Sequence, residues 1–357
     1  MKIDRTIVIV AALGVALAAV RAGAVAADRH AAARSAADRH AATRVADSLA
    51  LLAAESALDT LAATERAFAA LAVEKGMHEA FVHYLGRDGL VFRRGFVNGL
   101  KSWAQRNPPG TLDWAPGYAE VAGNADLGWT FGPWEYRPPT SDERDYGTFV
   151  TVWARPIEWI RPDERVWRVA LDMGISHPRP ARGVHDLTLE RGPVHPPLPL
   201  ARPPGVGLGV GVGVASGELG IGVATARSAR DIRWREMRHA VNQLLGTDRS
   251  YGFDLGRKGA AEAIGKYAAE DLRVFRDGAE PTLGKLPAIA AGATANRNRE
   301  WTPLGSRVST SYDLGYSWGL ARTRTTPPDT SAYFHIWRRD PRGEWVMIAD
   351  VENRFAH

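Results

Sequence analysis

The sequence predicts an α+β protein built of two similar domains, each with helices at its start and a curved antiparallel sheet at its end. Two observations predict this class. Residues 64–95 recur without a gap as residues 247–278, and the later part of each copy alternates apolar and polar residues between turn signals. The repeat is far longer than a solenoid unit, so each copy is expected to be a whole domain.

The duplicated residues fall in two blocks without internal gaps. The first block matches Thr64, Lys75, Gly76, Glu79, Tyr84, Asp88, Phe92, Arg93 and Gly95 with Thr247, Lys258, Gly259, Glu262, Tyr267, Asp271, Phe275, Arg276 and Gly278. The second block matches Trp114, Pro116, Asp126, Leu127, Gly128 and Gly132 with Trp301, Pro303, Asp313, Leu314, Gly315 and Gly319. The order of elements is therefore duplicated as well.

Composition permits two cores and narrows the classes of function. The chain has 357 residues, of which 45% are hydrophobic, and its formal net charge is +5. This is enough for two cores of roughly 100 to 150 residues each. Lys and Arg form no run of five, so we do not expect a nucleic-acid partner. The absence of cysteine excludes a disulfide framework.

The N-terminus has the pattern of an export signal. Lys2 and Arg5 precede an apolar run over 6–20, and the small residues 24–26 suit a cleavage site. We therefore predict a signal peptide over 1–27 and a periplasmic or secreted protein. The alternative is an uncleaved signal that anchors the chain in the membrane, although the run is short for a spanning helix.

Composition also divides the rest of the chain. An Ala- and Arg-rich spacer is expected over 28–48, followed by the first domain over 49–178. A Pro- and then Gly-rich linker is expected over 179–228, with the second domain over 229–357. The linker contains no G-x-G-x-x-G and is too glycine-rich for a membrane span.

An apolar stripe at helical spacing predicts the first helix of each copy. In the first copy the stripe is Leu51, Leu58, Leu61 and Phe68, and in the second it is Trp234, Val241, Leu244 and Tyr251. Gly76 after Lys75 is a helix stop. A short helix over about 77–85 or 259–269 should follow, then a strand, a further helical stretch around Lys101, and antiparallel strands.

The motif from Asp126 to Gly132 resembles the nuclear transport factor 2-like superfamily. Its SnoaL-like, ketosteroid-isomerase-like branch is also similar in the segments 64–68, 88–95 and 167–175. The resemblance covers both copies and implies cone-shaped domains whose open end holds a small apolar ligand. Members of the superfamily isomerise, cyclise, dehydrate or only bind, so the resemblance implies a fold and leaves the activity open.

Three functions stay open at this point. The first is a protein that binds a small apolar or aromatic molecule, and the second is an isomerase, dehydratase or cyclase that uses a carboxylate base. The third is an envelope module that interacts with other proteins. No G-x-S-x-G, H-E-x-x-H or P-loop occurs, so we expect no cofactor and no metal.

The acidic candidates for catalysis are Asp172 and Asp350, at equivalent places in the last strand of each copy. Asp172 shares a predicted strand face with Arg168, which favours a partly exposed ion pair. The same face in the second copy carries Val346 and Ile348. Asp350 is therefore the candidate general base, because apolar surroundings would raise its pKa.

Tyr333 is the candidate hydrogen-bond donor beside this base, and its position depends on hairpin register. The segment 340–343 is a turn in which Gly343 suits a bulge. We expect that bulge, which places Tyr333 and His335 on the face opposite Asp350. Without it, Tyr333 and Asp350 oppose each other directly. Either way, the second copy is the predicted place for proton transfer.

Aromatic residues are the candidates for a ligand pocket. The predicted pocket residues are Trp129, Trp153, Tyr316, Trp318 and His335. In the first copy Trp103, Trp114 and Trp134 could also line a pocket, although isolated tryptophans are more often core residues.

The two copies are expected to pack against each other as a pseudo-dimer within one chain. Single-domain relatives often make such a contact between chains, and one chain could supply both halves. Asp126 and Asp313 occur in both copies, which favours a structural role for them.

Overall fold

A computed structural model describes residues 51–155, 166–194, 226–292 and 299–355, together with residues 45, 48 and 49. The predicted signal peptide over 1–27 and the Gly-rich part of the predicted linker lie outside the described residues. The described residues from Leu51 onward belong to one compact unit. Within the described ranges, no helix combines the length and the apolar character needed to cross a membrane.

The first copy begins with a helix over 51–75. Its later elements are α2 (Met77–Tyr84), β1 (Leu85–Phe92), β2 (Phe96–Asn98), α3 (Gly99–Trp103), β3 (Thr111–Trp114), β4 (Tyr118–Val121), β5 (Leu127–Arg137), β6 (Asp145–Ala154), β7 (Arg168–Ser176) and β8 (Glu190–Arg191). The last of these strands lies inside the segment expected to be a linker.

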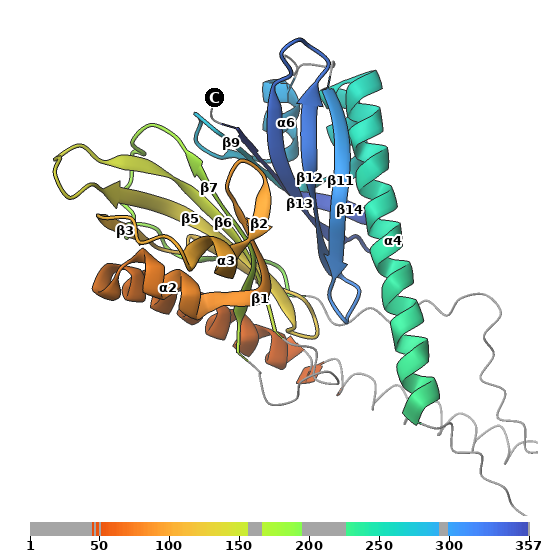
Figure 1. Cartoon of the computed structure of the whole chain (residues 1–357). Coiled ribbons are helices and arrows are strands. Elements are labelled where there is room, and N and C mark those ends of the chain that lie inside the picture. Colours follow the sequence, from red (N-terminus) through yellow and green to blue (C-terminus); the bar gives the residue numbers. More distant parts are fainter. Residues whose placement is uncertain are drawn as a thin grey trace, which may run out of the picture. The chain divides into compact units, whose positions relative to one another are not determined.

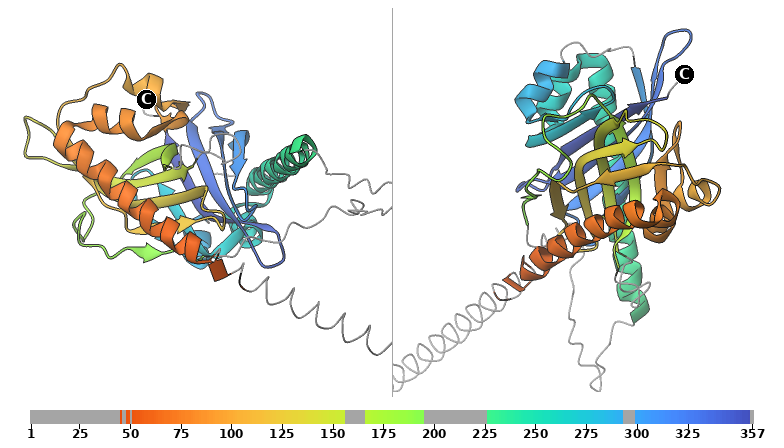
Figure 2. Two further views of the ribbon diagram at one scale, coloured as in Figure 1. Left: turned by 90° about the horizontal axis from the view of Figure 1, so that it is seen from below. Right: turned by 90° about the vertical axis from the view of Figure 1, so that its left-hand side faces the viewer.

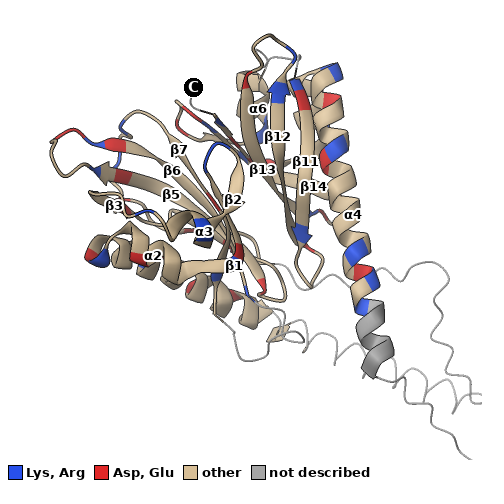
Figure 3. Ribbon diagram, in the orientation of Figure 1, with Lys and Arg blue, Asp and Glu red and all other residues tan. Residues whose placement is uncertain are grey.

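The second copy repeats this order. Its elements are α4 (Ala226–Lys258), α5 (Ala260–Tyr267), β9 (Ala268–Arg276), β10 (Thr282–Leu283), α6 (Lys285–Gly292), β11 (Arg299–Val308), β12 (Leu314–Thr323), β13 (Thr330–Arg339) and β14 (Trp345–Arg354). Figure 1 shows α4 alongside β11, and basic and acidic residues are interspersed on it (Figure 3).

The two sheets share one topology, except that the first carries the additional strand β8. Their strand orders are β2-β1-β7-β6-β5-β4-β8, with β3 also paired to β5, and β10-β9-β14-β13-β12-β11. The predicted α+β class with helices before a sheet is confirmed. The sheets are not wholly antiparallel, however, because β1 is parallel to β7 and β9 is parallel to β14. Short turns reverse the direction of successive strands in the meander, whereas β1 and β9 reach their partners from a distant part of the chain.

The first helix of each copy ends as the sequence predicts. Gly76 and Gly259 have φ of +91° and +94°, a conformation that glycine adopts at little cost. Leu58, Leu61 and Phe68 are buried on one face of the helix over 51–75, which packs on the first sheet (Figure 2).

Asp126 and Asp313 join the two copies through reciprocal hydrogen bonds. The backbone N–H of Thr310 donates to Oδ2 of Asp126 at 2.9 Å, and that of Gly123 donates to Oδ2 of Asp313 at 2.7 Å. One hydrophobic cluster also contains residues of both sheets, including Leu171 and Phe334. The structural role expected for the two aspartates is confirmed. Each one caps a turn of the other copy, and Asp313 also accepts hydrogen bonds from Ser309 and Ser311 of its own turn.

Candidate functional site

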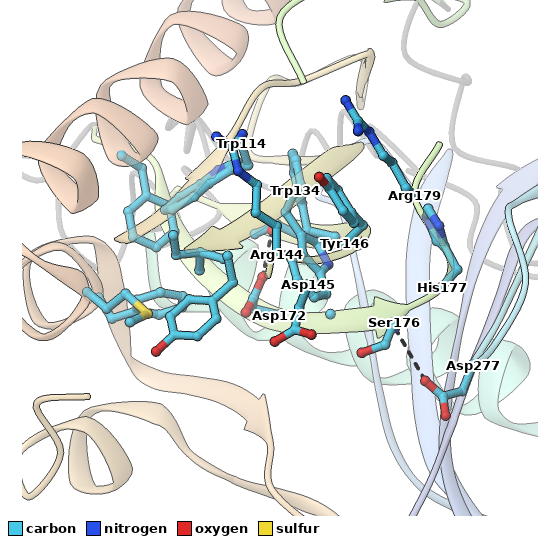
Figure 4. A pocket seen from close by; sticks show the side chains of 18 of the residues that line it. Trp114, Trp134, Arg144, Asp145, Tyr146, Asp172, Ser176, His177, Arg179 and Asp277 are labelled. Carbon is cyan, nitrogen blue, oxygen red and sulfur yellow. Dashed lines mark hydrogen bonds between the residues drawn. The ribbon is translucent and has the colours of Figure 1, made fainter. Parts of the chain in front are cut away.

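A cavity of about 870 Å³ opens in the first copy (Figure 4). Much of its wall is aromatic, with Phe68, Phe81, Trp103, Trp114, Trp134 and Phe149 among the lining residues. Glu65, Arg93, Thr151 and Asp172 supply polar groups, and Asp277 of the second copy also contributes. An apolar pocket with a few convergent polar groups is the usual form of a small-molecule site.

Glu65 places a carboxyl group on the buried face of the helix over 51–75. The side chain is 0% exposed. It accepts hydrogen bonds from Nε1 of Trp114 at 2.7 Å, Nε1 of Trp153 at 2.8 Å and Oγ1 of Thr130 at 2.5 Å. Burial raises the pKa of Glu65 to about 7, although these hydrogen bonds oppose the rise. The group can therefore exchange a proton near neutral pH.

Asp172 supplies the second carboxyl group from β7, and it lines the cavity (Figure 4). Oγ1 of Thr151 donates to it at 2.8 Å. Burial raises the pKa of Asp172 to about 6, against the hydrogen bond from Thr151 and the positive charge of Arg93. Two carboxyl groups with raised pKa values thus share one cavity.

The predicted ion pair between Asp172 and Arg168 is wrong. Arg168 donates instead to the backbone carbonyl of His83 at 2.7 Å. The pairing of β6 with β7 shifts between Val152 and Trp153, which leaves Ala170 as an extra residue. This bulge breaks the alternation of faces on which the prediction depended.

The same bulge recurs in the second copy and overturns the predicted register there. Ile336 pairs with Ala349 but Trp337 pairs with Met347, so Ile348 is the extra residue. The left-handed Gly343 is confirmed, with φ of +81°. With both features present, His335 lies directly opposite Asp350 instead of on the other face of the sheet.

His335 and Tyr333 are held in a buried network around Asp248. Nδ1 of His335 lies 2.6 Å from Oδ1 of Asp248, and the hydroxyl of Tyr333 donates to Oδ2 of Asp248 at 3.0 Å. Nε2 of His335 lies 3.5 Å from Oδ1 of Asp350, which is an ion-pair distance. Burial opposes a positive charge on His335 and would lower its pKa. Asp248 and Asp350 have the larger effect and raise the pKa of His335 to about 9.

The raised pKa expected for Asp350 is also wrong. Burial would raise it, but the Arg276 guanidinium, 2.6 Å from Oδ2, and His335 hold the pKa of Asp350 well below its usual range. Tyr333, His335 and Asp350 are each 1% exposed. The structure therefore brings the predicted Tyr333 and Asp350 into one cluster, closed from solvent, while the two carboxyl groups with raised pKa values line a cavity of the first copy.

The other predicted pocket residues lie away from the cavity wall. Trp129, Tyr316 and Trp318 pack in the hydrophobic cluster shared by the two sheets. Trp153 is 0% exposed and donates to Glu65. The tryptophans that do line the cavity are Trp103, Trp114 and Trp134, which the sequence left open between core and pocket.

The sequence did contain a signal for Glu65. It lies on the same helical face as Leu58, Leu61 and Phe68, where an acidic residue interrupts an apolar stripe. Asp248 is the acidic residue at the matching place of the second copy.

Across the residues that the structure describes, no three acidic or histidine side chains are grouped so that they could hold a metal ion.

No family model matches the sequence, and no curated protein is significantly similar to it. Solved structures similar in fold include a ketosteroid isomerase-like protein from Erwinia carotovora, at 15% identity, which covers 33% of this chain and 96% of its own with a TM-score of 0.27. A nuclear transport factor 2-like protein from Novosphingobium aromaticivorans is 18% identical and covers 38% of this chain and 92% of its own, with a TM-score of 0.29.

A third such structure is a nuclear transport factor 2-like protein of unknown function from Shewanella oneidensis. It is 14% identical and covers 31% of this chain and 97% of its own, with a TM-score of 0.27. These structures belong to the superfamily that the sequence motifs resemble, and the likeness is one of fold alone.

Proposed function

We propose that the first copy binds a small aromatic or apolar molecule. The observation that carries this proposal is the cavity of about 870 Å³, with aromatic walls and a few polar groups. Stacking on Trp103 and Trp114 and removal of apolar surface from water would supply the affinity. Asp172 and Thr151 would fix the orientation of the ligand.

A second candidate function is acid–base catalysis on the bound molecule, as in an isomerase or a dehydratase. The specific observation in its favour is the pair of carboxyl groups, Glu65 and Asp172, with pKa values raised to about 7 and about 6. Such values let one group give and the other take a proton near neutral pH. Asp172 is the candidate base because it lines the cavity and accepts the hydrogen bond of Thr151.

A thermal-shift screen of the chain against steroids, polyketides, aromatic acids and quinones tests the binding proposal. A ligand at a hundred times its dissociation constant should stabilise the fold by about 2.7 kcal/mol. A hit that disappears when the cavity is blocked by Gly174→Trp would place binding in the first copy. A blank across the library would contradict the proposal and favour a protein-interaction module.

The variant Asp172→Asn separates binding from catalysis for any hit. Unchanged affinity with turnover reduced by at least about a hundredfold supports the enzyme, because an amide cannot act as the base. Absence of turnover in both proteins supports a binding protein. Asp145→Asn is the matched control, since Asp145 also lines the cavity but is exposed to solvent at the start of β6.

We further propose that the protein is exported and that its two copies act as a pseudo-dimer within one chain. The N-terminal pattern over 1–27 supports export, and the reciprocal contacts of Asp126 and Asp313 support the pseudo-dimer. N-terminal sequencing of the protein from its native host and light scattering check the two points. An intact N-terminus in the cytoplasm, or a doubled mass with independently stable halves, would contradict them.

A further inference from the structure

The registers of the two sheets identify which side chains occupy matching places. Thr151 lies opposite Asp172 across β6 and β7, and His335 lies opposite Asp350 across β13 and β14. Glu65 and Asp248 match in the first helix of each copy, within the duplicated block. The two copies therefore hold acidic residues at the same two places, Glu65 or Asp248 in the helix and Asp172 or Asp350 in the strand, with threonine beside them in one copy and histidine in the other.

In the second copy the His335 imidazole lies between its two carboxylates. One ring nitrogen is 2.6 Å from Asp248 and the other is 3.5 Å from Asp350. Aromatic rings surround the imidazole, with centroids 5.2 Å away for Tyr251 and 4.7 Å for Tyr333. Further rings at 6.0 Å and 5.8 Å belong to Trp301 and Trp337.

The first copy has a matching ring of aromatic residues without an imidazole. Phe68, Trp114, Phe149 and Trp153 occupy the places of Tyr251, Trp301, Tyr333 and Trp337. Phe68 and Trp114 are 4.8 Å apart between centroids, and both line the cavity with Phe149. Thr151 also lines it, and its side chain is far shorter than that of histidine.

The two copies differ in the charged side chains around the strand aspartate. Within the described ranges, no cationic side chain forms an ion pair with Asp172. In the second copy Asp350 accepts a hydrogen bond from Arg276 at 2.6 Å, and it also contacts His335. Arg93, the match of Arg276, lies over the ring of Trp103 at 5.1 Å and, within the described ranges, makes no ion pair with Asp172. A carboxylate can accept about four hydrogen bonds. Asp172 accepts one, from Thr151, so it has acceptor capacity to spare in the described part of the chain.

We propose that the cavity of the first copy takes a planar nitrogen heterocycle of the imidazolium class, with one N–H directed to Asp172 and the opposite N–H towards Glu65. This inference rests on the proposed binding function and narrows its ligand. The ring would take the place that the His335 side chain fills in the second copy. A cavity of about 870 Å³ is far larger than this ring alone, so the heterocycle is carried by a larger molecule.

Titration calorimetry with 4-phenylimidazole tests the inference, and 5-phenyloxazole is the matched control. The two probes have similar shape, but the oxazole has no N–H to donate. We expect binding of 4-phenylimidazole and at least about tenfold weaker binding of 5-phenyloxazole, since hydrogen bonds to charged groups contribute more than neutral ones. Equal affinity for the two probes would overturn the inference.

Two variants locate the bound ring. Asp172→Asn should weaken 4-phenylimidazole at least about tenfold, whereas Asp145→Asn should change it less than about twofold. Thr151→His should abolish binding, because its own imidazole would occupy the place of the ligand. Retained affinity in both Asp172→Asn and Thr151→His would overturn the proposed position.

A reciprocal experiment in the second copy covers the case in which Thr151→His does not fold. His335→Thr removes the imidazole from between Asp248 and Asp350 and should lower the melting temperature. Millimolar imidazole should then raise the melting temperature of the variant more than that of the unaltered protein, in which only the first copy has this place open. An equal effect on both proteins would overturn the equivalence of the two places.

The outcomes also separate this inference from the function on which it rests. If members of the steroid, polyketide, aromatic-acid and quinone library bind in the cavity while 4-phenylimidazole does not, the heterocycle is excluded and the binding function stands. If neither the library nor the imidazole probe binds, both proposals are overturned.

Discussion

In the first copy Glu65 and Asp172 share a cavity, whereas in the second copy Asp248 and Asp350 are linked through His335. Apart from β8, which only the first copy has among the described residues, the strand order is shared, and the glycines that end the first helices and the bulges are the same in the two copies. The difference lies in a few side chains on a shared backbone. The fold therefore fixes where an acid is placed, while its neighbours decide whether the place is open or filled.

The matched acids in the last strands show how far neighbours control protonation. Burial raises the pKa of Asp172 to about 6. Asp172 is half-buried and Asp350 is fully buried, but Arg276 and His335 push the pKa of Asp350 in the opposite direction. The same fold position thus holds a carboxyl group with a raised pKa in one copy and one with a lowered pKa in the other.

The largest expected difference between the copies comes from replacing the matched helix acids with their amides. Asp248→Asn should lower the free energy of unfolding by about 3–5 kcal/mol, because it removes a partner from a buried ion pair. Glu65→Gln should cost much less at pH 8, because it also removes a poorly tolerated buried charge. Urea unfolding monitored by tryptophan fluorescence measures both. Equal losses would show that the two networks are energetically alike.

The two copies should contribute to the pH dependence of stability over two different pH intervals, or windows. Glu65 has a pKa raised from 4.5 to about 7, so its stabilising neutral form is lost as the pH rises through that interval. His335 has a pKa raised from 6.5 to about 9, so its contribution is complete below pH 6.5 and is lost as the pH rises through 9. Each shift corresponds to about 3 kcal/mol.

Matched variants assign each window to its copy. The double variant E65Q/D172N should flatten the stability curve between about pH 4 and 7, and His335→Gln should flatten it between about pH 6.5 and 9. Denaturant titrations over that range provide the measurement. If one variant flattened the stability curve in both pH intervals, the two networks would be coupled.

A smaller effect is expected from two glycines of the first sheet. A Cβ at Gly174 would meet only Nε1 of Trp134, at 3.6 Å, so Gly174→Ala should gain up to about 1 kcal/mol by restricting the unfolded chain. A Cβ at Gly147 would lie 2.0 Å from the carbonyl oxygen of Ile175. Gly147→Ala should therefore cost about 1–3 kcal/mol. A stabilising Gly147→Ala, measured by thermal unfolding, would contradict this account of the close approach of Gly147 to Ile175.

The architecture was predictable because its signals are local or duplicated. Gly76 and Gly259 end their helices through their own backbone freedom, and the apolar stripe around Leu61 identifies the buried helix face. Recurrence of Asp126 as Asp313 was enough to assign a structural role. What the sequence could not show was the partner, because each aspartate caps a turn of the other copy.

The site was harder to predict because it depends on one-residue details of register. A bulge at Ala170 and its match at Ile348 reversed the predicted faces around both Asp172 and Asp350. No turn residue marks these bulges, since alanine and isoleucine are ordinary strand residues. The sequence therefore identifies both aspartates, but the neighbouring side chains predicted for each of them were wrong. Glu65 was overlooked although it interrupts an apolar stripe.

The reciprocal bonds of Asp126 and Asp313 have a consequence for how this molecule can change over generations. In a dimer of identical subunits every substitution appears on both sides of the symmetry axis, so a mutation that fills one site fills both. Here the two halves of the contact are encoded separately. One half can therefore acquire a buried network of charged residues while the other half keeps an open cavity. A single chain can then combine a stabilising network with a vacant site.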